Sequence, residues 1–108
     1  MNAPIPIEYR DYWDVPRIFL ARHQGRLYLF DCEFDETLED FRQGYRVYLM
    51  PEISTEDREG SWAEFPKRAI RELQTIEVGL VSFANAEKSM IDSSIIDNLI
   101  GESTRRIA

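Results

Sequence analysis

The chain has 108 residues, of which 44% are hydrophobic and 31% charged, and its formal net charge is -7 at pH 7. This length fits a single domain over residues 1–108, and the composition is typical of a folded globular protein rather than a disordered one. Nucleic-acid binding depends on the neutralisation of phosphates, so the negative balance argues against a nucleic-acid partner.

The expected localisation follows from what the sequence lacks. No stretch approaches 18 consecutive apolar residues, so we expect no membrane association through a spanning helix. The first residues have no basic segment followed by an apolar run, so we expect no signal peptide, and the cytoplasm is the default compartment. Cys32 is the single cysteine, which excludes an intramolecular disulfide.

The clearest predicted element is a β-hairpin over residues 17–34. Its first strand contains four consecutive apolar residues, 18–21, which is typical of a strand covered on both faces. A tight turn is predicted at Gln24-Gly25, because glycine adopts positive φ without steric cost. The return strand alternates between two faces. One face is expected to carry Tyr28, Phe30, Cys32 and Phe34.

The segments around the hairpin are less regular. Residues 1–8 are expected to form an extended, mobile arm, because Pro4 and Pro6 disfavour a helix. The aromatic and charged segment 9–14 is either an edge strand or a loop that covers one end of the sheet. Residues 45–50 predict a third strand, and the polar residues 51–60 predict an exposed loop.

The second half of the chain predicts two helices and a strand. The first helix begins either near Trp62, where Ser61 and Glu64 have the spacing of a capping box, or near Pro66, which is favoured at a first helical position. Residues 75–84 are rich in β-branched and aromatic side chains and predict the fourth strand.

The second helix is predicted over residues 89–100, with Gly101 at its C-terminal cap and a mobile tail at 102–108. Together these elements predict an α+β domain, in which an antiparallel sheet of four or five strands carries two short helices on one face. An open sheet edge invites pairing, so a homodimer is one expected arrangement.

Six carboxylates and no basic residue lie between positions 31 and 40. The spacing of Asp31, Glu33 and Asp35 is similar to the start of a calcium loop. However, the positions that would require glycine and glutamate are Glu36 and Arg42. Because strand alternation places the first carboxylates opposite the aromatic face, we expect a solvated acidic face or a partner surface, and no metal.

His23 and Cys32 are the only residues of their types. The hairpin register pairs Cys32 near Arg17, so we expect Cys32 in the core and His23 exposed in the turn. The sequence contains no phosphate-binding loop and no nucleophile elbow. It therefore predicts no catalytic residues and no cofactor. A small enzyme that uses carboxylates gathered from several elements is the alternative.

Tyrosine and tryptophan side chains outside the clear strands suggest a contact surface, because these residues are enriched at protein interfaces. Sealing the ends of the sheet is their alternative role. The leading hypothesis is a non-catalytic, acidic, cytoplasmic protein-interaction domain whose partner is another protein or a second copy. An acidic inhibitor or immunity protein for a basic toxin or nuclease is a further alternative. The candidate partner surface comprises Tyr12, Trp13, Trp62, Asp35, Glu36, Glu39 and Asp40.

The pattern from Tyr12 to Ala21, followed by Gly25 to Leu29, resembles the opening of small uncharacterised bacterial proteins. Those proteins have an aromatic-Asp-x-Pro segment, an apolar strand, a glycine turn and a Tyr-Leu return strand. The resemblance covers the first third of the chain. It implies a bacterial or phage origin and brings no activity or site residues with it.

Overall fold

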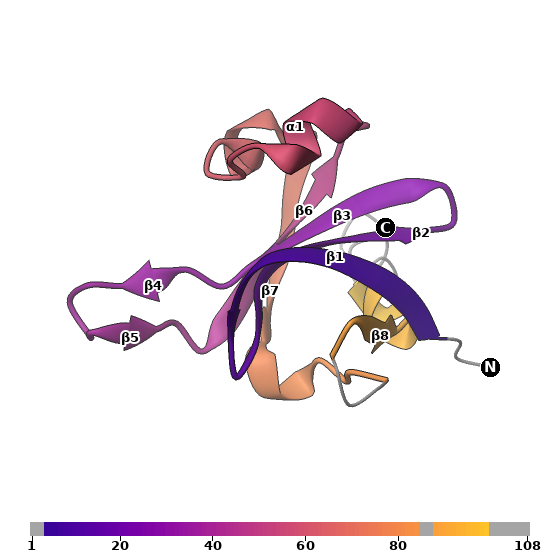
Figure 1. Ribbon diagram of the computed structural model, residues 1–108. Coiled ribbons are helices and arrows are strands. Elements are labelled where there is room, and N and C mark those ends of the chain that lie inside the picture. Colours follow the sequence, from indigo (N-terminus) through magenta and orange to yellow (C-terminus); the bar gives the residue numbers. More distant parts are fainter. Residues whose placement is uncertain (1–3, 85–87, 100–108) are drawn as a thin grey trace.

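The computed structural model describes residues 4–84 and 88–99. Its main element is a six-stranded antiparallel sheet with the order β7-β6-β3-β2-β1-β8, from which a second, two-stranded sheet projects (Figure 1). The strands of the large sheet are β1 Pro4–Trp13, β2 Val15–His23, β3 Arg26–Asp31, β6 Gly44–Met50, β7 Arg71–Glu77 and β8 Met90–Asp92. The small sheet consists of β4 Phe34–Asp35 and β5 Asp40–Phe41. The helical segments are α1 Thr55–Glu59, the 3-10 turns η1 Phe65–Arg68 and η2 Val78–Leu80, and residues 94–99.

The architecture is α+β, as the sequence predicts, but the sheet has six strands instead of four or five. The additional strands come from the two ends of the described chain. β1 pairs with β2 over most of its length and with β8 at its start, where Ile5 lies opposite Ile91. Residues 4–8, which the sequence predicts as an extended, mobile N-terminal segment, are extended, but they belong to the sheet as part of β1.

The β2–β3 hairpin forms as predicted. Gln24 and Gly25 have φ angles of 52° and 77°, the positive values that a two-residue type I′ turn requires. The backbone N–H of Cys32 donates to the carbonyl oxygen of Arg17 at 2.7 Å, which confirms the predicted register.

Both faces of the sheet are buried, which explains the uninterrupted apolar run at residues 18–21. The first face contributes a cluster that includes Phe19, Phe30, Cys32, Tyr45, Val47, Ile91, Ile95, Ile96 and Leu99. The second contributes a cluster of Leu20, Leu27, Leu29, Tyr48, Met50, Ile53, Trp62 and Phe65. The helical segment 94–99 covers the first face, and the α1–η1 region covers the second (Figure 1). The prediction of two helices on one face is wrong, because a sheet with two apolar faces must cover both.

The connection between β6 and β7 differs most from the prediction. Residues 51–60, expected as a loop, contain α1, because the Ser54 hydroxyl accepts a hydrogen bond from the N–H of Asp57 at 3.1 Å and caps the helix. The first predicted helix is only the four-residue η1, with Pro66 in its first turn. Trp62 precedes this turn and lies in the core.

The fourth strand is predicted over residues 75–84 but observed as β7, which begins four residues earlier and ends at Glu77. Gly79 lies in η2. Leu73 packs against the first cluster from β7, whereas Ile70 is exposed.

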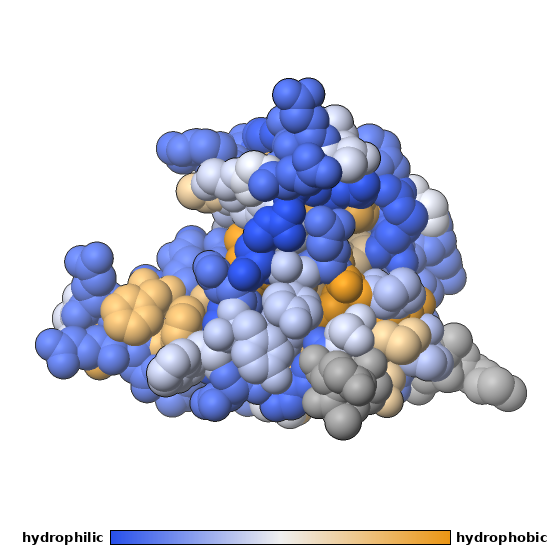
Figure 2. Space-filling model, viewed as in Figure 1, coloured by the Kyte–Doolittle hydropathy of each residue, from blue (hydrophilic) through white to orange (hydrophobic). Residues whose placement is uncertain are grey.

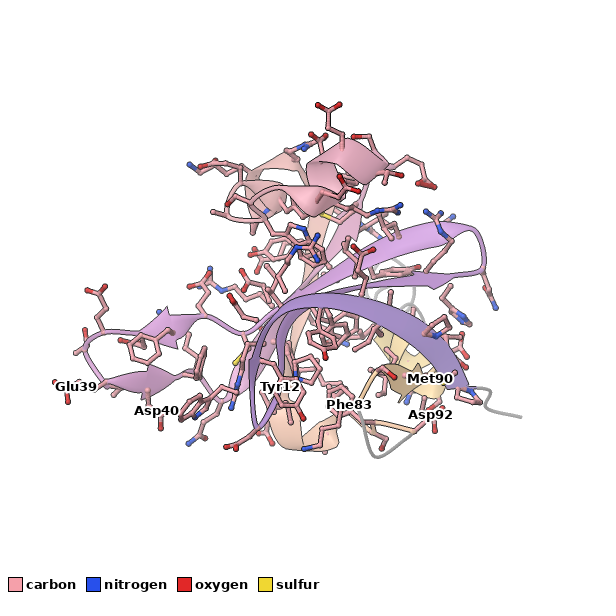
Figure 3. All side chains as sticks on the ribbon, in the orientation of Figure 1. Tyr12, Glu39, Asp40, Phe83, Met90 and Asp92 are labelled. Atoms are coloured by element: carbon pink, nitrogen blue, oxygen red, sulfur yellow. The ribbon has the colours of Figure 1, made fainter. Side chains whose placement is uncertain are left out.

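The second predicted helix begins later than expected. Residues 90–92 form β8, and the helical segment follows from position 94, where the Asp92 carboxylate accepts a hydrogen bond from the N–H of Ser94 at 3.0 Å. Figure 3 shows Asp92 and Met90 close to Phe83, whose backbone forms an isolated bridge with Ile91. Gly101 and the tail 102–108 lie outside the described residues.

Candidate functional site

A projecting arm, formed by β4 and β5, is the most distinctive surface feature of the described chain (Figure 1). Its tip is built by Asp35, whose carboxylate accepts hydrogen bonds from the N–H groups of Thr37 at 2.9 Å and Leu38 at 3.4 Å. This is an Asx turn, a structure that aspartate favours. Glu39 completes the turn with a positive φ of 52°. The tip of the arm is therefore stabilised by local hydrogen bonds.

The base of the arm is anchored to the sheet. The N–H of Arg42 donates to the carbonyl of Glu33 at 2.9 Å, and the Cys32 thiol donates to the carbonyl of Arg42 at 3.0 Å. The guanidinium of Arg17 lies over the Phe41 ring at 4.4 Å, and Phe34 meets the same ring edge-on at 5.3 Å. These contacts hold the arm in a defined orientation.

Large apolar side chains are exposed on the arm and beside it. Phe34 is 55% exposed, Leu38 67%, Tyr12 46% and Trp13 64%. Figure 2 shows apolar side chains on the arm among hydrophilic ones, and Figure 3 shows Glu39 and Asp40 on its outer part. We call the following set the arm surface: Tyr12, Trp13, Phe34, Leu38, Asp35, Glu36, Glu39 and Asp40.

Trp13 belongs to this surface because it faces the arm across a groove of about 440 Å³. Asp40, Phe41 and Val78 line the same groove. The ring is presented by the tight β1–β2 turn, in which Asp14 has a positive φ of 67°. The guanidinium of Arg17 donates to the Trp13 carbonyl at 2.9 Å and supports the turn.

A second concavity, of about 460 Å³, lies on the other side of the arm base. Its floor includes Asp11, Ile18 and Asp31, which lie side by side on β1, β2 and β3. Arg46 of β6 continues this row next to Asp31. The loop of residues 60–63 forms its opposite wall. We call this concavity the Asp31 pocket.

Burial, together with the nearby charges of Glu33 and Asp11, raises the pKa of the Asp31 carboxyl to about 6, while the charge of Arg46 opposes this shift. Arg46 also pairs with Glu33 at 3.8 Å. The sequence placed Asp31 on a solvated face. That expectation is wrong, because the face opposite Phe30 is the second core.

Most of the residues predicted for the partner surface lie at the surface, but Trp62 is buried. The four acidic residues lie on the arm, and Trp13 lines the groove beside it. Tyr12 is exposed next to Trp13 in β1, where its ring contacts that of Tyr9. Trp62 is only 4% exposed, its Nε1–H donates to the carbonyl of Arg58 at 2.8 Å, and its ring stacks on Phe65. It therefore supports the second core.

The exposed apolar residues Phe34 and Leu38 were missed as surface positions. Phe34 follows the alternation of the buried face in the sequence, but the strand pairing stops at Asp31 and resumes only in the arm. The signal that could have identified the arm is the absence of core-sized residues between Phe34 and Phe41 apart from Leu38.

Cys32 is buried, as predicted, and burial raises the pKa of its thiol. The guanidinium of Arg17 donates to its sulfur at 3.5 Å. His23 is not the exposed turn residue that the sequence predicts. Its side chain is only 13% exposed, and its Nε2 lies 2.8 Å from Asp97 Oδ1, which joins the hairpin to the helical segment 94–99.

The described residues, 4–84 and 88–99, contain no group of three His, Cys, Asp or Glu side chains arranged to hold a metal ion. Within the same part of the chain, no helix has the length and apolar character needed to cross a membrane. Comparisons with protein-family models, with curated proteins and with solved structures found no match.

Proposed function

We propose that the chain is a non-catalytic protein-interaction domain that binds its partner through the arm surface. The observation that carries the proposal is the exposure of four large apolar side chains on and beside a projecting, acidic arm. Exposed apolar groups of this size are typical of contact sites when they lie together, whereas isolated ones need no explanation.

The charges of the arm indicate the chemistry of the partner. Among the described residues, the carboxylates of Glu36 and Glu39 form no ion pair, whereas Asp35 lies 3.7 Å from the guanidinium of Arg42. Carboxylates that surround apolar side chains favour a partner with an apolar patch framed by lysine or arginine. A basic toxin or nuclease inhibited by this chain is the narrower form of the proposal, and an adjacent gene for such a protein would support it.

The test is capture of the partner from the native host, followed by affinity measurements with the purified partner. Replacing Trp13 by alanine together with Leu38 by serine is expected to weaken binding more than ten-fold, since exposed aromatic anchors dominate interface energies. Changing Glu36 and Glu39 to glutamine is expected to slow association and to reduce the dependence of affinity on salt.

Ile70→Ser is the matched control, because Ile70 is 63% exposed but lies directly before β7, outside the arm surface. This variant is expected to bind the partner as the wild type does. A partner that binds both arm variants with unchanged affinity and is indifferent to salt would contradict the proposal.

A further inference from the structure

Tyr28 carries the one buried side-chain polar atom without a hydrogen-bond partner in the part of the chain that the structure describes. The residue lies in β3 and is only 1% exposed. A hydroxyl removed from water without a partner costs stability, so an orphaned hydroxyl in a folded chain requires an explanation. A ligand that accepts a hydrogen bond from it is one such explanation.

Two arginines lie beside Tyr28 on the same face of the sheet. Arg26 comes two positions earlier in β3, and side chains two apart in a strand share a face. Arg71 of β7 pairs with Leu49 of β6, which in turn pairs with Tyr28. Burial raises the pKa of the Tyr28 hydroxyl and Asp97 adds to this shift, whereas the charges of Arg26 and Arg71 oppose it.

Neither of these arginines has a partner of its own. Among the described residues, Arg26 and Arg71 form no ion pair and no ring contact, and neither bonds the Tyr28 hydroxyl, although Arg26 is close to it. Every other arginine within residues 4–84 and 88–99 has an ion pair or a hydrogen bond. The net charge of -7 shows that carboxylates are abundant, so a shortage of them is not the reason.

The carboxylate that faces this cluster is already engaged. Asp97 Oδ1 lies 2.8 Å from Nε2 of His23, at the end of the hairpin where Arg26 begins β3. The cluster of Arg26, Arg71 and Tyr28 therefore combines two exposed guanidinium groups and one buried hydroxyl, all three of them donors without an acceptor.

This set of donors matches a phosphate group better than a carboxylate. A guanidinium binds the two oxygens of a carboxylate in a bidentate manner, so one arginine satisfies a carboxylate. A phosphate monoester carries a charge of about -1.5 to -2 at pH 7 and has three strong acceptor oxygens, so it can use two guanidinium groups and a hydroxyl together.

We propose that Arg26, Arg71 and the Tyr28 hydroxyl bind the phosphate group of a small molecule. The guanidinium groups are its counter-ions, and the hydroxyl is a third donor. The cluster lies at the start of β3, whereas the arm follows the end of that strand at Asp31. Phosphate binding does not depend on the arm surface, so this inference goes beyond the proposed function.

The experiment titrates the full chain with inorganic phosphate at pH 8 and constant ionic strength, while backbone amide shifts are recorded by NMR. Phosphate is expected to bind with a dissociation constant on the order of millimolar and to shift the amides of residues 26–28 and 71. It is also expected to raise the melting temperature, because it binds only the folded chain. Acetate is expected to bind at least about ten-fold more weakly.

Three variants remove one donor group each. Arg26→Gln and Arg71→Gln are each expected to weaken phosphate binding about ten-fold, because a charge-assisted contact is lost. Tyr28→Phe removes only the hydroxyl. It is expected to weaken phosphate binding several-fold without lowering the melting temperature of the free chain, since no hydrogen bond within the protein is lost.

Arg22→Gln is the matched control, because Arg22 is an exposed arginine of the same hairpin but is paired with Glu52. This variant is expected to bind phosphate as the wild type does. Equal binding of acetate and phosphate would overturn the inference, as would wild-type phosphate affinity in any of the three donor variants. The two arginine variants change exposed side chains, so they decide the result even if Tyr28→Phe does not fold.

Discussion

Replacing Phe30 by alanine is expected to lower the free energy of unfolding by about 3–5 kcal/mol. Phe30 is fully buried in β3 at the centre of the first core. Its ring stacks on Phe19 at a centroid distance of 4.6 Å and meets the Tyr45 ring edge-on at 5.9 Å. Alanine would remove these contacts and leave a cavity that the paired strands cannot close.

Urea unfolding measures this loss, which is a large fraction of the roughly 5–15 kcal/mol typical of a whole domain. Phe34→Ala is the matched control, because it removes the same ring from the exposed arm. We expect it to cost at most about 1 kcal/mol, through the contact with Phe41. Equal destabilisation by the two variants would mean that the core is not centred on β3.

Replacing Asp31 by asparagine is expected to stabilise the fold at neutral pH and to have little effect at pH 4. The pKa of Asp31 is raised from 3.8 to about 6 in the folded chain. A raised pKa means that the folded state holds the proton more tightly than the unfolded state does. The resulting stability is fully present below pH 3.8 and is lost as the pH rises through about 6.

The shift corresponds to about 3 kcal/mol in a fully buried site, and we expect about 1–2 kcal/mol here because the carboxylate is partly exposed to solvent. Unfolding curves at pH 4, 6 and 8 measure the difference between the wild type and Asp31→Asn. Glu39→Gln is the control and is expected to change little at any of these values. A stability difference between the wild type and Asp31→Asn that does not vary with pH would contradict this prediction.

The hairpin could be predicted from the sequence because its signals are local. A glycine in the turn and apolar residues on both sides specify the pairing of β2 with β3. The register then places Cys32 next to Arg17, and this neighbourhood is observed. Local interactions also stabilise the tip of the arm, where the Asp35 carboxylate accepts hydrogen bonds from the backbone.

The segment between β6 and the C-terminus could not be predicted as well, because short elements there depend on distant partners. The residues of β7 form a strand only because β6 offers an edge to pair with, and Ile91 joins a strand only because β1 lies beside it. Such tertiary contacts override the helical spacing of the apolar residues.

The candidate site was predicted in part. The exposure of Tyr12 and Trp13 and the acidic character of residues 35–40 could be predicted from the sequence, although both aromatic residues belong to the end of β1. The burial of Trp62 and the pocket at Asp31 do not, since both arise where the loop of residues 60–63 covers the second face of the sheet.

The sequence by itself therefore determined the elements that local interactions stabilise: the β2–β3 hairpin, the buried position of Cys32 and the acidic character of residues 31–40. Only the tertiary structure decided which face of each strand is buried, which carboxylate is partly buried and which aromatic rings remain exposed. The physical reason is that burial depends on what covers a residue. Asp31 and Trp62 are covered by residues that are far away in the sequence and that come into contact with them only when the chain folds.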